Sequence, residues 1–178
     1  MPVYYTYFIS SLPMLHFGMK PPFSYEDFIA RCKGLILEED ITLIKTLPRL
    51  EIDTIKDISN ETVRKWLVFD TALRNELVRQ RAARLHKDPN QYLRMAGYTD
   101  LSTTHIALSA YRNPAILEAE KILDTARWGA LEELAIGHYF DSDALFIYAL
   151  KLLIVERWAR IKQADNLELF EEVMQISR

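Results

Sequence analysis

The side chains best suited to catalytic or metal chemistry are few in this sequence and lie far apart. The four histidines, His16, His86, His105 and His138, never occur as His-x-x-x-His or Glu-x-x-His, the spacings that bring two metal ligands to one helical face. The single cysteine, Cys32, lies on the apolar side of a predicted helix, where a small buried side chain is expected rather than a nucleophile. The sequence therefore predicts neither a metal site nor a cysteine-based active site.

Acidic side chains occur as neighbours rather than in catalytic arrangements. The adjacent acids at 38–40, 132–133 and 171–172 point in different directions on a helix, so solvated helix faces explain them. The chain contains no G-x-S-x-G motif, no phosphate-binding loop and no dinucleotide fingerprint. We therefore expect no catalytic residue, no cofactor and no enzymatic activity, with a helical enzyme of unrecognised type as one alternative.

One predicted helix carries an excess of positive charge. Residues 64–87 hold seven basic and two acidic side chains, whereas residues 23–61 hold five basic and nine acidic ones. Mutual neutralisation of these two segments within the fold is one explanation. The other is a docking face for an acidic protein or for RNA. RNA is the less favoured partner because no RNA-binding motif or interleaved aromatic pattern accompanies the charges.

Three arginines near the end of this basic helix are the candidate partner-binding residues. They are Arg79, Arg81 and Arg84. Arg74 is a weaker candidate because it can pair instead with Asp70, four residues earlier on the same helix. The formal net charge of the whole chain is −3, which gives no general attraction to nucleic acid.

Composition predicts an all-α fold. The chain has 178 residues, of which 49% are hydrophobic, enough to bury a substantial core. It has only five glycines and no Asn-Gly or Asp-Gly pair, so the turn chemistry of a strand-rich fold is missing. We expect a helical bundle of short N-terminal helices followed by three long helices.

Capping residues and apolar spacing define the helices of the first half. Ser24, with Asp27 three residues later, predicts a capping box that opens a helix over 25–36, and a second helix is predicted over 38–47. Ser59 or Asn60 is predicted to cap a long helix that ends near residue 86. Its apolar residues recur at three- and four-residue steps and predict one buried stripe. The stripe consists of Val63, Trp66, Leu67, Leu73, Leu77 and Leu85.

The second half of the chain is also predicted to consist of helices with capping residues. Short helical turns are predicted over 90–95 and 102–111. Asn113 as cap and Pro114 as first helical residue then predict a helix that continues to Gly137. Asp141 or Ser142 is predicted to cap a helix over 143–164, and a separate final segment over 167–177 is expected to pack against these long helices.

The opening residues are harder to assign. The stretch VYYTYFIS at 3–10 alternates like a strand, but no partner strand is evident in the rest of the chain. A short helix ending at Pro13 and an extended strand both remain open. In either case we expect Tyr5, Tyr7 and Phe8 to pack inward, so that this block acts as a structural clasp.

The sequence also bears on domain organisation and on cellular compartment. No low-complexity linker or internal repeat divides it. We interpret residues 1–178 as a single helical domain, with two subdomains over 1–88 and 89–178 as the alternative. The single cysteine fits a reducing compartment, and neither a signal-peptide pattern nor a run of roughly 18 apolar residues is present. We expect a cytoplasmic protein without a membrane span.

Two stretches, 4–36 and 69–85, resemble a bacterial family known as a domain of unknown function. The first carries the Tyr-Tyr, Ser-Leu-Pro, Pro-Pro, Ser and Cys pattern with which members of that family start. Its matching residues are Tyr4, Tyr5, Ser11, Leu12, Pro13, Gly18, Pro21, Pro22, Ser24 and Cys32. The second stretch matches through Arg74, Asn75, Leu77, Arg81, Ala82 and Leu85.

That family is associated with operons for bacterial V-type (archaeal-type) ATPases, in the position where the C subunit, also called the d subunit, is expected. The chain is also similar to the C subunit itself, in the Tyr-x-Tyr start at Tyr5 and Tyr7, the Ser-led helix over 24–28 and the acidic helix over 38–47. The C subunit is an all-helical funnel of three related subdomains, and this chain is too short for all three.

The resemblance implies a non-catalytic component that couples the proteolipid ring to the central stalk in ion or proton transport. It implies stalk or ring subunits as partners, a peripheral location at the inner membrane through the complex, and an arrangement of subdomains like that of the C subunit. The alternative from the residues alone is a small helical adaptor that binds RNA or an acidic protein through its basic helix.

Overall fold

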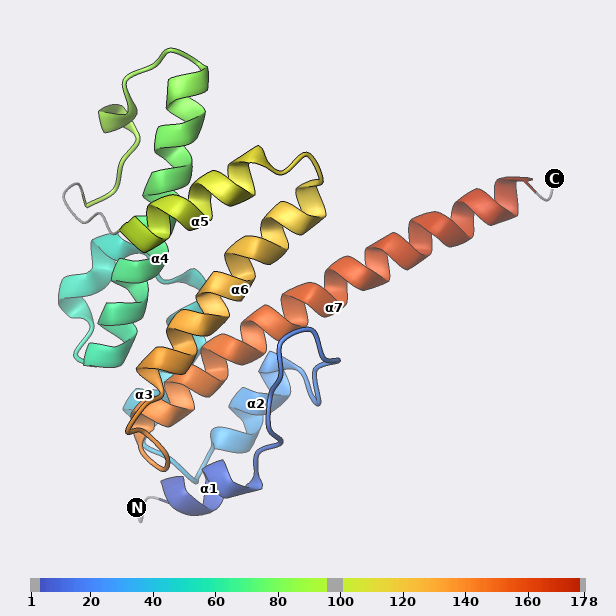
Figure 1. Cartoon of the computed structure of the whole chain (residues 1–178). Coiled ribbons are helices and arrows are strands. Elements are labelled where there is room, and N and C mark those ends of the chain that lie inside the picture. Colours follow the sequence, from blue (N-terminus) through green and yellow to red (C-terminus); the bar gives the residue numbers. More distant parts are fainter. Residues whose placement is uncertain (1–3, 96–100, 177–178) are drawn as a thin grey trace. The chain divides into compact units, whose positions relative to one another are not determined.

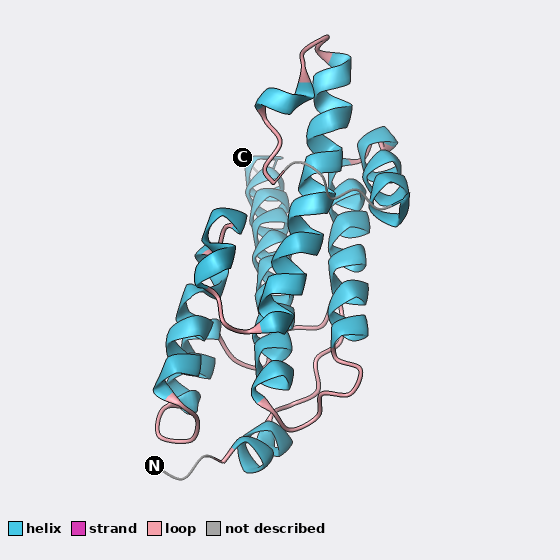
Figure 2. Cartoon of the chain, turned by 90° about the vertical axis from the view of Figure 1, so that its left-hand side faces the viewer, coloured by secondary structure: helices cyan, strands magenta, loops and turns pink. Residues whose placement is uncertain are grey.

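The computed structural model describes residues 4–95 and 101–176, with side chains up to residue 164. This part of the chain is helical and contains no β-strand, so the predicted all-α class is confirmed (Figure 2). Short 3₁₀ helices, labelled η, separate some of the α-helices. Among the described helices, none is long and apolar enough to cross a membrane.

The chain folds into two compact units, and the first is built from both ends of the sequence (Figure 1). Unit 1 comprises Met1–Lys45 and Phe140–Arg178, and unit 2 comprises Thr46–Tyr139. This division differs from the predicted alternative of 1–88 and 89–178, because the helices on either side of residue 88 share one core in unit 2. Unit 1 contains α1 (Tyr5–Ser11), α2 (Tyr25–Cys32), α3 (Glu38–Thr46) and α7 (Ser142–Ile176). Unit 2 contains η1 (Leu47–Arg49), η2 (Ile52–Asp57), α4 (Glu61–Arg84), η3 (Pro89–Gln91), α5 (Leu101–Arg112) and α6 (Ile116–Leu134).

Phe28 on α2 is the centre of the unit 1 core. It is fully buried, and its ring centroid lies 5.4 Å from that of Tyr148 on α7 and 6.2 Å from that of Phe8 on α1. Phe23 and Tyr25 complete the cluster, with centroids 6.3 Å and 6.1 Å from Phe28. These spacings are typical of aromatic pairs that add to the stability of a core. One aromatic side chain therefore joins three helices of this unit.

Hydrogen bonds at its first turn fix the start of α2. The predicted capping box is confirmed, because the Asp27 N–H donates to Ser24 Oγ over 3.0 Å and the Ser24 N–H donates to the Asp27 carboxylate over 3.4 Å. The Tyr25 N–H donates to Glu156 Oε1 of α7 over 2.7 Å. Because a carboxylate is favoured at a helix N-terminus, this bond holds α2 on α7. The Tyr25 hydroxyl also donates to the carbonyl of Ile44 on α3 over 2.7 Å.

The opening residues form helix α1, which decides between the two predicted alternatives in favour of the helix. A helix satisfies its backbone groups internally, which a lone strand cannot do. The helix ends at Ser11, two residues before Pro13. Phe8 is buried and the Tyr5 hydroxyl donates to the Asp40 carboxylate, but the prediction for Tyr7 was wrong, since it is 71% exposed. A helical rotation of about 100° per residue turns Tyr7 away from the face that carries Phe8.

The chain after α1 runs along α7 (Figure 1). The Pro13 carbonyl accepts a hydrogen bond from the Tyr148 hydroxyl over 3.1 Å, and the Gly18 carbonyl accepts one from Lys162 Nζ over 3.1 Å. Tyr148 and Lys162 lie about four helical turns apart. The predicted clasp therefore has a structural basis in bonds at two levels of α7.

Unit 2 packs α4, α5 and α6 around one apolar core. Leu73 of α4, Ala107 and Ala110 of α5, and Leu123 of α6 are buried at its centre. The two alanines on α5 leave little side-chain volume between helices, so the neighbouring helices can approach closely. Partly buried side chains surround this centre, namely Phe69, Leu77, Ile106, Ala119 and Ile122.

Helix α4 confirms the predicted long helix and its cap. The Val63 N–H donates to Asn60 Oδ1 over 2.8 Å, so Asn60 rather than Ser59 is the capping residue. The prediction that Leu85 is buried was wrong, since α4 ends at Arg84 and Leu85 is 63% exposed. The other members of the predicted stripe are buried or partly buried, namely Val63, Trp66, Leu67, Leu73 and Leu77.

The connections on either side of α5 differ from the predicted short turns. The 3₁₀ helix η3 includes only residues 90 and 91 of the helical turn predicted over 90–95, and the turn predicted over 102–111 is the full helix α5. Asn113 was wrongly predicted as the cap of α6, which begins at Ile116. Its side chain instead accepts a hydrogen bond from the Ala115 N–H over 2.9 Å, one residue ahead of the helix. The other end of α6 lies at Leu134, and Gly137 adopts φ +90° in the turn beyond.

Helix α7 runs unbroken from Ser142 to Ile176. The Ala144 N–H donates to Asp141 Oδ1 over 2.9 Å, so Asp141 caps the helix. The prediction of a separate final segment over 167–177 was wrong, because no glycine or proline interrupts residues 142–176. The side-chain packing predicted for that segment lies outside the described residues.

Replacing Phe8 should destabilise the protein far more than replacing its exposed neighbour. Phe8→Ala removes a buried ring that contacts Phe28, and we expect a loss of about 3–5 kcal/mol in the free energy of unfolding. Tyr7→Ala should change that free energy by less than about 0.5 kcal/mol. Urea unfolding followed by circular dichroism measures both. Equal losses in the two variants would contradict the packing of α1 described above.

Alkaline pH should destabilise unit 1. Burial raises the pKa of the Cys32 thiol from 9.0 to about 12, and burial likewise raises the pKa of the Tyr148 hydroxyl from 10.0 to about 12. The unfolded chain therefore loses these protons at lower pH than the folded chain. The stability that they contribute is complete below about pH 9 and is lost as the pH rises towards 12.

We accordingly expect the urea midpoint to fall between pH 9 and pH 11, with a smaller fall in Cys32→Ala. A disulfide reagent at pH 8 should modify Cys32 much more slowly in the folded protein than in urea. A midpoint that rises with pH, or a thiol equally reactive in both states, would contradict the burial of Cys32.

Candidate functional site

Two buried aspartates and a mostly buried arginine meet where α4 packs on α6. Arg127 Nε lies 2.7 Å from Asp70 Oδ1, and Arg127 Nη1 lies 2.8 Å from Asp124 Oδ1. Asp124 is 1% exposed and Asp70 is 8% exposed. Because Asp70 and Arg127 come from different helices, their ion pair fixes the two helices to one another.

The charge of Arg127 is retained in this environment. Burial by itself lowers the pKa of the guanidinium, but the neighbouring carboxylates of Asp70 and Asp124 outweigh that effect, and the pKa is raised above its ordinary value. Removing one member of such a group leaves an uncompensated buried charge. The cluster is therefore a fixed element of unit 2 and makes a stable base for the residues beside it.

Arg74 extends the cluster towards the surface. Its Nη2 atom lies 2.7 Å from Asp70 Oδ2, so both oxygens of Asp70 have a guanidinium partner. The side chain of Arg74 is 65% exposed, in contrast to that of Arg127. The predicted pairing of Arg74 with Asp70 is confirmed.

A cavity of about 240 Å³ opens beside Arg74. It is bounded by α4, by residues 50–52 and by Tyr92 and Arg94 in the segment after η3. Its walls include the apolar side chains of Leu67 and Val78 as well as charged groups. All of these residues belong to unit 2, so the cavity is contained in one compact body.

The far wall of the cavity is held by Asn75. The Asn75 Nδ2 group donates to the Arg94 carbonyl over 2.6 Å, and the Arg94 N–H donates to Asn75 Oδ1 over 3.1 Å. The nitrogen and the oxygen of the buried Asn75 amide therefore both bind the backbone of Arg94. The guanidinium of Arg94 then reaches Glu51, with Nη1 2.8 Å from Oε2. These contacts join α4, the 92–94 segment and the residue that precedes η2.

The three predicted docking arginines have different surroundings. Arg79 is partly buried and forms an ion pair with the buried carboxylate of Glu76, so it supports the fold rather than a free surface. Arg81 and Arg84 are exposed in the last turn of α4. Only these two retain the surroundings expected of a docking residue.

Three of the four histidines lie apart, as their spacing in the sequence predicts. His16, His86 and His105 are exposed on different elements. Cys32 is buried, with its thiol pKa raised by burial. These surroundings agree with surface histidines and an unreactive thiol, whereas the absence of a metal stays a prediction.

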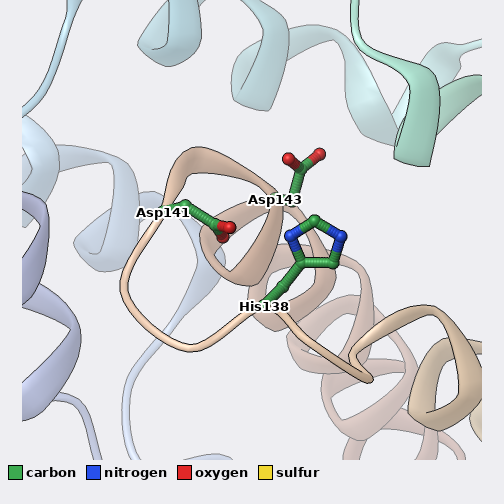
Figure 3. A group of neighbouring side chains, drawn as sticks. All are labelled: His138, Asp141 and Asp143. Carbon is green, nitrogen blue, oxygen red and sulfur yellow. The ribbon is translucent and has the colours of Figure 1, made fainter.

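His138 has acidic neighbours that the search for paired histidines missed. In the segment between α6 and α7, His138, Asp141 and Asp143 each offer one ligand atom, and these atoms lie within 4.8 Å of one another (Figure 3). The spacing His-x-x-Asp-x-Asp is the signal that could have found them. Asp141 is already engaged as the cap of α7, and the three are half-buried surface side chains. Nothing else in the described chain points to a bound ion there.

The ion-pair cluster was also missed. Asp70 lies within the predicted apolar stripe, three residues from Leu67 and from Leu73, and a charged residue at such a position is a sign of a buried partner. Asp124 and Arg127, at positions i and i+3 of one helix, are the matching pair.

Comparison with known proteins gives a family match for the second half of the chain. Residues 106–177 match a family described as "Protein of unknown function (DUF2764)". The matched region runs from α5 to the end of α7 and includes Asp124 and Arg127. It lies outside the stretches 4–36 and 69–85 on which the resemblance was based, and the match itself carries no link to V-type ATPases. No curated protein and no solved structure gave a significant match.

Replacing Arg127 tests the buried cluster. Arg127→Leu leaves Asp70 and Asp124 without their buried partner, and we expect a loss of about 3–5 kcal/mol in the free energy of unfolding. Arg64→Leu removes an exposed arginine from α4 and should change that free energy by less than about 0.5 kcal/mol. Urea unfolding of both variants gives the comparison. A loss below about 1 kcal/mol for Arg127→Leu would show that the cluster does not support unit 2.

Proposed function

We propose that this chain is a non-catalytic assembly component that docks an acidic protein through the basic end of α4. The observation that carries the proposal is the exposure of Arg81, Arg84 and Lys87 around the end of that helix. Within the described residues, none of the three forms an ion pair. Their charges are therefore available to a partner.

The shape of unit 2 supports a docking role for this end of α4. The last turns of α4 and the connection to η3 project past α5 (Figure 1). Leu85, beside the two arginines in sequence, is 63% exposed and adds an apolar contact. Arginine is enriched at protein–protein interfaces and among the residues that contribute most to binding. Arginines in a last turn also interact favourably with the helix dipole, so a test must separate binding from helix stability.

The partner that the resemblance implies is a stalk or ring subunit of a V-type ATPase. In that setting the chain takes the place of the C subunit and transmits force without chemistry of its own. Long capped helices and buried ion pairs suit that task because they resist deformation. Peripheral association with the membrane then comes through the complex.

The surroundings of its buried acids support the non-catalytic part of the proposal. Asp70, Glu76 and Asp124 are buried carboxylates, and each is held in an ion pair with an arginine of the same unit. A carboxylate that is already committed to an arginine is poorly placed to exchange protons with a substrate. These acids therefore support a structural role rather than a catalytic one.

Neutralising the exposed arginines should weaken the complex. Arg81→Ala with Arg84→Ala is compared with the control Arg64→Ala with Arg112→Ala, which removes the same charge from other positions of unit 2. Exposed ion pairs contribute up to about 1 kcal/mol each, so the recovery of V-type ATPase subunits with the tagged chain should fall up to about 30-fold for the first pair. The control pair should recover them as well as the unmodified chain does. Circular dichroism confirms that each variant is folded.

Two outcomes would overturn the proposal in different ways. If the unmodified chain recovers no ATPase subunit from an intact complex, the coupling role is wrong. If both variants recover the subunits equally, the end of α4 is not the docking surface. Recovery of RNA instead, falling steeply with added salt, would replace the proposal with the RNA adaptor.

A further inference from the structure

We propose that the cavity beside Arg74 binds a small organic or inorganic monoanion, held between the guanidinium groups of Arg74 and Arg94. This site lies on the middle of α4 and is independent of the docking surface proposed at the end of that helix. The ligand class is a compact carboxylate or phosphate. The proposal rests on the unused hydrogen-bond donors of the two arginines, on the rigidity of the cavity walls and on the volume of the cavity.

Two guanidinium groups in the wall of the cavity keep hydrogen-bond donors that their ion pairs do not use. A guanidinium has five N–H donors and no acceptor. Within the described chain, the guanidinium of Arg74 contacts only Asp70, and that of Arg94 contacts only Glu51. Each arginine therefore keeps donors that its acidic partner does not use. Thr71 and Tyr92, which both carry a hydroxyl group, also line the cavity.

The acidic groups in the wall are already occupied. Asp70 receives Arg127 on one oxygen and Arg74 on the other, and Glu51 receives Arg94. A cation entering the cavity would meet carboxylates that already pair with arginines, and it would be repelled by the guanidinium charges. An anion can accept the remaining N–H groups of both arginines, and arginines suit carboxylate and phosphate oxygens.

Both arginines are positioned before any ligand arrives. Arg74 is anchored on Asp70, which is held by the buried Arg127. The backbone of Arg94 is fixed by the two hydrogen bonds from Asn75. Ordering a side chain on binding costs free energy, so positions fixed in advance favour affinity. Asn75 and Arg127 are positioning residues for this site, since each acts through another side chain.

The volume restricts the ligand. The cavity volume of about 240 Å³ lies below the roughly 300 Å³ at which pockets for drug-sized ligands begin. The apolar wall includes Leu67 and Val78 and suits a short carbon chain. The neighbouring charges balance, because the three arginines Arg74, Arg94 and Arg127 face Asp70, Asp124 and Glu51. A single negative charge therefore fits better than a polyanion.

Titration of the full chain with two probes tests the site. Inorganic phosphate and acetate are added separately at constant ionic strength, while proton–nitrogen NMR spectra follow the Nε–Hε signals of the arginines. We expect saturable shifts of the Arg74 and Arg94 signals with at least one probe. The probe that binds more tightly distinguishes a phosphate ligand from a carboxylate ligand.

Variants supply the control. Arg94→Gln and Arg74→Gln should each weaken binding at least tenfold. Arg64→Gln, which removes the same charge elsewhere on α4, should leave the affinity unchanged. Because Arg74 and Arg94 are mostly exposed, both variants should fold, which their far-ultraviolet circular dichroism verifies. Shifts that do not saturate with either probe, that appear equally on Arg64, or that survive both cavity variants would overturn the proposal.

Discussion

The buried pairing of Arg127 with Asp70 is the interaction on which the rest of unit 2 depends. It joins α6 to α4 across 57 positions of sequence and is completed by Asp124 on α6. Apolar packing alone is non-directional, so the leucines and alanines of this core leave the rotation of α4 about its axis loosely defined. A hydrogen-bonded ion pair is directional and therefore restricts that rotation. Once Asp70 is fixed, the direction of every other side chain on α4 is fixed with it, including those that line the cavity and those at its projecting end.

Such a cluster contributes more to the specificity of helix packing than to the stability of the fold. Taking charges out of water costs free energy that their attraction only partly returns, and well-packed apolar residues often serve as well. The cluster also lies at the boundary of two environments, since Arg127 is 13% exposed and Arg74 is 65% exposed, yet both contact the same carboxylate. Asp70 therefore links the mostly buried Arg127 to Arg74 at the surface. We infer that the position of Arg74 is set by the core rather than by solvent.

Local signals in the sequence were enough to predict much of the fold but little of the candidate site. The caps at Ser24 and Asn60 depend on residues within three positions, and both were identified correctly. Asn113 failed because a side chain that satisfies one backbone donor can do so just outside a helix as well as at its start. The pair of Asp70 and Arg127 needs the packing of two distant helices to be known first. Its members look like ordinary helix charges until that packing is in place, so only the position of Asp70 in an apolar stripe hinted at it.

Unit 2 is inserted into unit 1 along the chain, because unit 1 begins before residue 46 and resumes after residue 139. The aromatic cluster around Phe28 thus needs Tyr148, which lies on the far side of the whole insertion. If the insertion stayed a flexible loop, bringing its ends together would cost roughly 4 kcal/mol beyond a constant term, from the logarithmic dependence on loop length. A folded insertion fixes its own ends and removes most of that entropy loss. During synthesis, moreover, unit 2 is complete before most of α7 exists. The topology therefore allows unit 2 to fold during synthesis while unit 1 still waits for its second segment, residues 140–178.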